Sequence, residues 1–103
     1  MDRFGLPTGT LQKIVELFKN HSEIQRAYIY GSRAKGNFKP GSDIDICIFS
    51  STMDLSAKFK LDLELDDLLL PYKIDLAVFQ MIENQNLIEH IQRAGVTIYQ
   101  KEI

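Results

Sequence analysis

The sequence predicts a single α/β domain of the α+β type, in which one mixed sheet of about four strands is covered by helices. Three observations lead to this prediction. At 103 residues with 45% hydrophobic content, the chain is long enough to bury one core and too short for two. Helical apolar patterns alternate along it with short β-prone runs. Repeats, linkers and low-complexity tracts are absent from the sequence, so we expect residues 1–103 to form one domain.

The first half of the chain predicts a helix, a strand, a shaped loop or short helical turn, and a second strand. Their expected bounds are 10–19, 27–30, 31–42 and 44–49. The helix follows from apolar residues at helical spacing, with Thr8 or Thr10 supplying the N-cap oxygen. The first strand is short, β-prone and stopped by Gly31, and the loop contains three glycines and a proline. The second strand is apolar on both faces except at its start, as in a central strand.

The second half predicts a long helix, a strand, a shorter helix and a final strand. Their expected bounds are 55–70, 74–79, 84–93 and 96–99. Pro71 ends the long helix and Gly95 the shorter one. The long helix has two apolar stripes on nearly opposite sides, Leu61, Leu65, Leu68 and Leu69 on one and Leu55, Phe59, Leu63 and Leu70 on the other. One stripe covers the sheet, so the other needs a different partner.

Composition limits the classes of function. A formal net charge of -2 argues against a domain that holds a long nucleic acid by neutralising its phosphates, so a small nucleotide or a protein is the expected partner. The one cysteine, Cys47, cannot form an internal disulfide. The sequence has neither a run of ~20 apolar residues nor the pattern of a signal peptide. We therefore expect a cytoplasmic protein with no membrane segment.

Acidic residues open two of the predicted strands. Asp43 and Asp45 are two positions apart, so their side chains share one face of the strand. Asp75 enters the later strand and joins this pair if the two strands are neighbours. Three such carboxylates repel one another unless a cation neutralises them. Mg²⁺ prefers oxygen ligands, and two ions can stabilise the entering and leaving oxygens of a phosphoryl displacement, so the pattern favours nucleotide transfer.

A glycine-serine pair precedes the acidic pair, with ten residues between them. Gly31 allows a tight turn and a close approach of the backbone to a ligand, and Ser32 offers a hydroxyl and an amide to phosphate oxygens. Arg33 and Lys35 add positive charge nearby. These four residues are the predicted triphosphate-binding group, with the two basic residues as helpers.

Each of these features also has a structural interpretation. A glycine-serine pair is a common turn, an acidic pair can mark a solvated strand end, and Asp75 can be an edge-strand charge that discourages aggregation. His21 and His90 lack partners at metal-ligand spacing and are expected to be structural, and Cys47 lacks an activating neighbour. The combination, at this spacing and at the start of strongly apolar strands, favours the functional interpretation.

Residues 31–36 (GSRAKG) and 41–46 (GSDIDI) closely resemble the signature of the DNA polymerase β nucleotidyltransferase superfamily, and more narrowly its minimal nucleotidyltransferases. The resemblance covers nearly the whole chain. It implies a nucleotidyltransferase core in which Asp43 and Asp45 are Mg²⁺ ligands. Asp75 is then the third carboxylate, which also helps activate the acceptor hydroxyl. ATP or another nucleoside triphosphate is the implied donor.

Family members of this size resemble the antitoxins of pairs whose toxin is a helical HEPN protein. The resemblance therefore implies transfer of AMP to a hydroxyl of such a partner. Two alternatives stay open: an antitoxin that neutralises its partner by covering it, and an enzyme that modifies a small molecule. The second apolar stripe of the long helix offers a place for a partner or for a second copy in a homo-oligomer.

Overall fold

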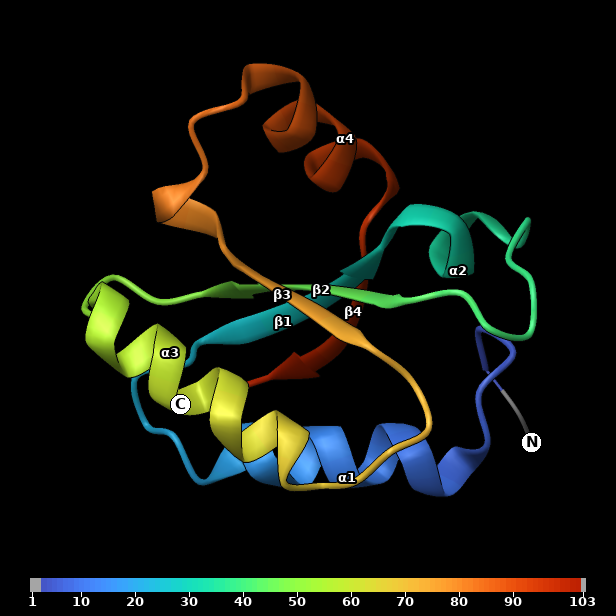
Figure 1. The fold of residues 1–103 in the computed structure, drawn as a ribbon. Helices are drawn as coiled ribbons and strands as arrows, with labels where there is room; N and C mark the ends of the chain where they lie inside the picture. The colour runs from blue at the N-terminus through green and yellow to red at the C-terminus, as the bar shows by residue number, and fades with distance from the viewer. Residues whose placement is uncertain (1–2, 103) are drawn as a thin grey trace.

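The computed structural model describes residues 3–102, which form one sheet between two layers of helix (Figure 1). The elements in chain order are α1 (Thr8–Lys19), β1 (Arg26–Tyr30), α2 (Gly31–Lys35), β2 (Ile44–Phe49), α3 (Leu55–Asp66), β3 (Ile74–Val78), the 3-10 turn η1 (Phe79–Met81), α4 (Gln85–Ala94) and β4 (Val96–Gln100). The prediction of a mixed sheet covered by helices is confirmed. Of the helices in the described range, none combines the length and hydrophobicity of a membrane span.

The four strands lie in the order β3-β2-β1-β4. β1 pairs antiparallel with both β2 and β4, whereas β2 pairs parallel with β3. A parallel pair needs a crossover connection, which α3 provides between β2 and β3. The consequence for the site is that the starts of β2 and β3 lie at the same edge of the sheet.

Alternation along β2 separates a structural face of the sheet from a second face with acidic residues. Ile44, Ile46 and Ile48 are fully buried in the main core, to which α1 and α3 contribute. Cys47 belongs to the smaller cluster on the other face, where Ile91 of α4 packs. Figure 1 shows the same division, with α1 and α3 on one side of the sheet and α4 on the other. Asp45 shares its face with Cys47 because side chains two residues apart point the same way.

The predicted end of the long helix is wrong. α3 ends at Asp66, residues 67–68 form a turn, and an irregular segment leads from there to β3. The backbone N–H of Leu69 bonds the carbonyl of Asp66 at 3.0 Å, and Leu69 itself has φ of 54°, which no α-helix accommodates. Leu69 is consequently 88% exposed instead of lining the buried stripe. Pro71 contributes, because the residue before a proline is disfavoured in helical conformation.

The start of α1 differs from the prediction by two residues and both ends of α4 by one, whereas the end of α1 and the start of α3 agree with it. The N-cap of α1 is Pro7, without a side-chain hydrogen bond, so the expected threonine cap is also wrong. The N-cap of α4 is Asn84, whose side chain accepts from the N–H of Leu87 at 3.2 Å. Gly95 is the C-cap of that helix, as predicted.

Candidate active site

The start of the parallel pair places two of the three predicted carboxylates side by side. Asp45 of β2 and Asp75 of β3 are direct partners in the register of the two strands. Neighbouring strands lie about 4.8 Å apart, so the two Cα atoms are close. Asp43 lies two residues before Asp45, just outside β2. Asp45 is half-buried, whereas Asp43 and Asp75 are exposed, so the group opens to solvent at the edge of the sheet.

The carboxylates influence one another electrostatically. Burial raises the pKa of Asp45, and the nearby charges of Asp75 and then Asp43 raise it further. The charges of Asp75 and Asp43 therefore both reach the Asp45 carboxylate. Residues 3–102 contain no three acidic, histidine or cysteine side chains already arranged to hold a metal ion. The carboxylates of Asp75 and Asp43 are nevertheless close enough to Asp45 for their charges to disfavour its ionised form.

Gly31 is required at the turn between β1 and α2 for two separate reasons. Its φ is 73°, in the left-handed region that favours glycine. A Cβ atom built at this position would also overlap Oδ2 of Asp45. The glycine backbone therefore lies directly against the Asp45 carboxylate, which joins the two parts of the predicted motif in space.

Ser32 and Lys35 lie on α2, next to this turn. Ser32 is half-buried, and its carbonyl accepts hydrogen bonds from the N–H groups of Gly36 at 2.9 Å and Asn37 at 3.2 Å. Those bonds hold the turn that follows α2. Lys35 is exposed in the last turn of α2.

Arg33 differs from its neighbours because it points into the protein. Only 2% of its surface is exposed, and its guanidinium donates to the carbonyl of Ser42 at 2.9 and 3.2 Å, and to the carbonyl of Phe4 at 3.0 Å. It also donates to the carbonyl of Pro40 at 3.3 Å. The Arg33 side chain thus supports the loop that leads into Asp43, although its backbone belongs to the same short helix as Gly31, Ser32 and Lys35.

Tyr30 is a site residue that the sequence interpretation did not select. It is the register partner of Asp45 on the other side of β2, and it is 7% exposed. Burial, followed by the charges of Asp45 and Asp75, raises the pKa of its phenol far above the ordinary value. The phenol therefore stays neutral and remains a hydrogen-bond donor. Its ring meets His90 of α4 edge to face, with centroids 6.1 Å apart.

Cys47 lies on the same face, two residues beyond Asp45. Burial raises the pKa of its thiol to about 12, so it is a thiol and not a thiolate at neutral pH. Because the thiolate is the nucleophilic form, burial disfavours covalent chemistry at this position.

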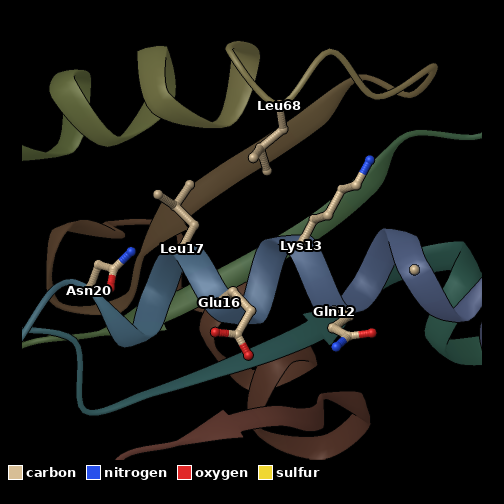
Figure 2. Close-up of a pocket in the computed structure, with 7 residues that line it drawn as sticks. Gln12, Lys13, Glu16, Leu17, Asn20 and Leu68 are labelled. Carbon is tan, nitrogen blue, oxygen red and sulfur yellow. The ribbon is translucent and has the colours of Figure 1, made fainter.

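Hollows in the surface lie away from the carboxylates. Figure 2 shows one of about 540 Å³, in which Leu17 of α1 and Leu68 extend toward each other, with Lys13 beside them. This hollow belongs to the α1 and α3 side of the sheet, opposite the face of Asp45. A second hollow, of about 780 Å³, is lined by Arg26, Phe49 and Lys101 among others. Neither of the two contains a residue of the acidic site.

A glycine turn packs against the carboxylate of Asp45, and two more aspartates lie at or next to the starts of β2 and β3, which is the arrangement that the sequence predicted for nucleotide transfer. Residues 12–103 match the model of the family described as polymerase beta, nucleotidyltransferase. The chain belongs to that family. A comparison with curated proteins found no significant match.

Solved structures with the same fold come from MntA–HepT toxin–antitoxin pairs. A chain of a toxin–antitoxin crystal structure with AMP-PNP is 24% identical, with a TM-score of 0.73 over 89% of this chain and 74% of that one. A chain of the MntA–HepT complex is 22% identical, with a TM-score of 0.69 over 92% of this chain and 74% of that one. A third, from the structure of tri-AMPylated Shewanella oneidensis HEPN toxin in complex with MNT antitoxin, is 23% identical, with a TM-score of 0.67 over 89% of this chain and 71% of that one.

Proposed function

We propose that this chain is a Mg²⁺-dependent adenylyltransferase that moves AMP from ATP onto a hydroxyl of a HEPN-type partner and thereby acts as the antitoxin of a toxin–antitoxin pair. The observation that carries the proposal is the register of Asp45 beside Asp75, with Gly31 packed against Asp45. Membership of the nucleotidyltransferase family supports the reaction class. The likeness to complexes that contain an AMPylated HEPN toxin supports the choice of donor and partner. Because ATP is the donor, the proposed place of action is the cytoplasm.

The acidic group fits a divalent cation. Its donors are carboxylate oxygens, which Mg²⁺ prefers. Burial and then the charges of Asp75 and Asp43 raise the pKa of Asp45, and a cation relieves both the burial of its charge and the repulsion from its neighbours. Asp43, Asp45 and Asp75 would hold the metal, with two ions expected. When bound, Mg²⁺ neutralises the phosphate oxygens and the charge that develops on the leaving pyrophosphate.

The residues of the chain then have separate tasks in the transfer. The turn at Gly31 and Ser32 binds and orients the triphosphate, with Lys35 as an exposed positive charge beside it. Asp75, exposed at the rim, accepts the proton of the acceptor hydroxyl. The hydroxyl oxygen forms a bond to the α-phosphorus while the bond from that phosphorus to the bridging oxygen breaks, and pyrophosphate leaves. Arg33 and Tyr30 keep the loop and the carboxylates in position.

The experiment that tests this proposal is incubation of the protein with labelled ATP, Mg²⁺ and the product of a neighbouring HEPN gene, followed by intact-mass measurement of both chains. Gain of AMP by the HEPN protein, absent with Asp43→Ala, is the expected result. Protection of cells by Asp43→Ala as good as by the wild type would instead support an antitoxin that acts by covering its partner. Label on a small molecule alone would indicate an enzyme that modifies a small molecule.

A further inference from the structure

One helix carries an apolar surface that the fold leaves uncovered. Leu55, Phe59 and Leu63 of α3 are 57, 55 and 65% exposed, although each is large and apolar. They are four residues apart, so they form one stripe, about 12 Å long at 1.5 Å per residue. We call these three side chains the α3 stripe. Three large apolar side chains in a row on one helix are more than the scattered exposure of an ordinary surface.

The opposite side of α3 is fixed to the body of the protein. Leu61 and Leu65 are buried in the main core, at 0 and 3% exposure. Glu64 approaches the residues after α1, with its Oε1 3.1 Å from Nε2 of His21. The helix therefore cannot rotate to bury the α3 stripe without losing its own core contacts. Within residues 3–102, no other element covers it.

The charge around the α3 stripe restricts what kind of molecule can cover it. Residues 54–67 contain five acidic residues and two lysines, which gives this segment a formal charge of -3, whereas the whole chain has -2. Lys58 is held by Asp62 at 2.9 Å. Asp66 and Asp67 are exposed, follow Leu63 by three and four residues, and form no ion pair with other residues of the described range. The α3 stripe with its unpaired carboxylates therefore complements a partner whose own apolar stripe is flanked by basic groups.

We propose that the α3 stripe is the docking surface for a partner protein that presents an amphipathic helix with lysine or arginine along the edges of its apolar face. A second copy of this chain is the poorer occupant, because pairing two α3 helices brings two segments of -3 together. The surface lies on the face of the sheet opposite the carboxylates, so a docked partner leaves the Asp45 site open. Recognition by the α3 stripe does not depend on nucleotide transfer.

The test uses the intact protein and two synthetic helical peptides of about 18 residues, long enough for partial helicity in water. Both carry the same leucine stripe, flanked by lysine in one peptide and by glutamate in the other. The lysine peptide is expected to bind with a micromolar Kd, at least about 10-fold tighter than the glutamate peptide. Amide shifts in a ¹⁵N NMR titration are expected to concentrate in residues 54–67.

Two variants and a control make the assignment specific. The double variant Phe59→Ser with Leu63→Ser is expected to weaken binding of the lysine peptide by about 10-fold or more, because both apolar anchors are lost. Asp66→Asn with Asp67→Asn is expected to reduce its affinity and the dependence of that affinity on salt. Met81→Ser, which removes an exposed apolar side chain of η1, is the matched control. It is expected to change neither the affinity for the lysine peptide nor the salt dependence of that affinity.

Several outcomes would overturn the proposal. These are failure of the lysine peptide to bind, equal binding of the glutamate peptide, and unchanged binding by the double serine variant. A dimer in sedimentation velocity that the double serine variant disperses would assign the α3 stripe to a second copy. Binding of wild-type protein to phosphatidylcholine vesicles, lost in that variant, would assign it to a lipid surface.

Discussion

The two faces of the sheet have opposite properties, although they are made from the same strands. Toward α1 and α3, every second residue of β2 is a fully buried isoleucine. Toward α4, the same strand begins with half-buried Asp45, which lies beside Asp75. The first face stabilises the fold by burial, whereas the second holds carboxylates that repel one another. Stability and chemistry are therefore separable by mutations one residue apart on a single strand.

The largest expected effect is on catalysis, at the acidic face. Asp43→Ala or Asp45→Ala removes a proposed Mg²⁺ ligand, so nucleotide transfer should fall by at least about 10³-fold while the fold survives. Circular dichroism and single-turnover transfer at saturating Mg²⁺ measure the two properties separately. Either variant with wild-type transfer would show that the metal lies elsewhere.

The next effect is on stability, at the isoleucine face. Ile46→Ala removes a fully buried side chain from the main core and should lower the free energy of unfolding by about 2 to 5 kcal/mol. Ile46→Val, the milder control, should cost about 0.5 to 1.5 kcal/mol. Urea titration measures the free energy of unfolding of both variants. At a temperature where the protein stays folded, both variants should transfer AMP within a few-fold of the wild type, and a loss as large as that of Asp45→Ala would break the separation of the two faces.

A smaller effect concerns nucleotide binding at the turn. Ser32→Leu should weaken ATP binding by about 10-fold, because a branched side chain beside Gly31 obstructs the approach of the triphosphate. Calorimetry at saturating Mg²⁺ gives the affinity, and Ser32→Ala is the control that removes the hydroxyl without adding bulk. Unchanged ATP affinity in Ser32→Leu would indicate that the glycine-serine pair is an ordinary turn with no role in triphosphate binding.

The smallest effect is a pH dependence of stability without metal. The folded pKa of Asp45 lies above its unfolded value of 3.8, so the folded state binds the proton more tightly. In EDTA, Asp45→Asn should therefore be more stable than the wild type at pH 7. The difference should shrink as the pH falls through the folded pKa, because the wild-type carboxyl then becomes neutral too. If the stability difference between Asp45→Asn and the wild type grew on acidification, the pKa of Asp45 would be lowered by folding, which contradicts this account.

The parts of the site that the sequence predicted are those set by local rules. Alternation along one strand put Asp43 and Asp45 on one face, and the need for a tight turn selected Gly31. Asp75 required the additional assumption that two strands are neighbours, which the parallel register of β2 and β3 satisfies.

Long-range contacts account for what the sequence did not predict. The partners of Arg33 include Phe4, 29 residues away, so no local pattern distinguishes this buried support from a phosphate ligand. Tyr30 is likewise placed against the carboxylates only by pairing of β1 with β2. The end of α3 was missed because leucines continue past Asp66, while the chain must already turn to reach β3.

The measurement closest to the central claim is single-turnover AMP transfer by Asp75→Asn at saturating ATP, Mg²⁺ and acceptor, with ATP affinity measured alongside. Asparagine keeps the shape of the side chain and removes its charge, which matters most when the acceptor hydroxyl loses its proton. We predict a rate lower by about 10² to 10⁴-fold with ATP affinity nearly unchanged. A rate within a few-fold of the wild type would make Asp75 a solvated strand residue and would contradict the three-carboxylate site.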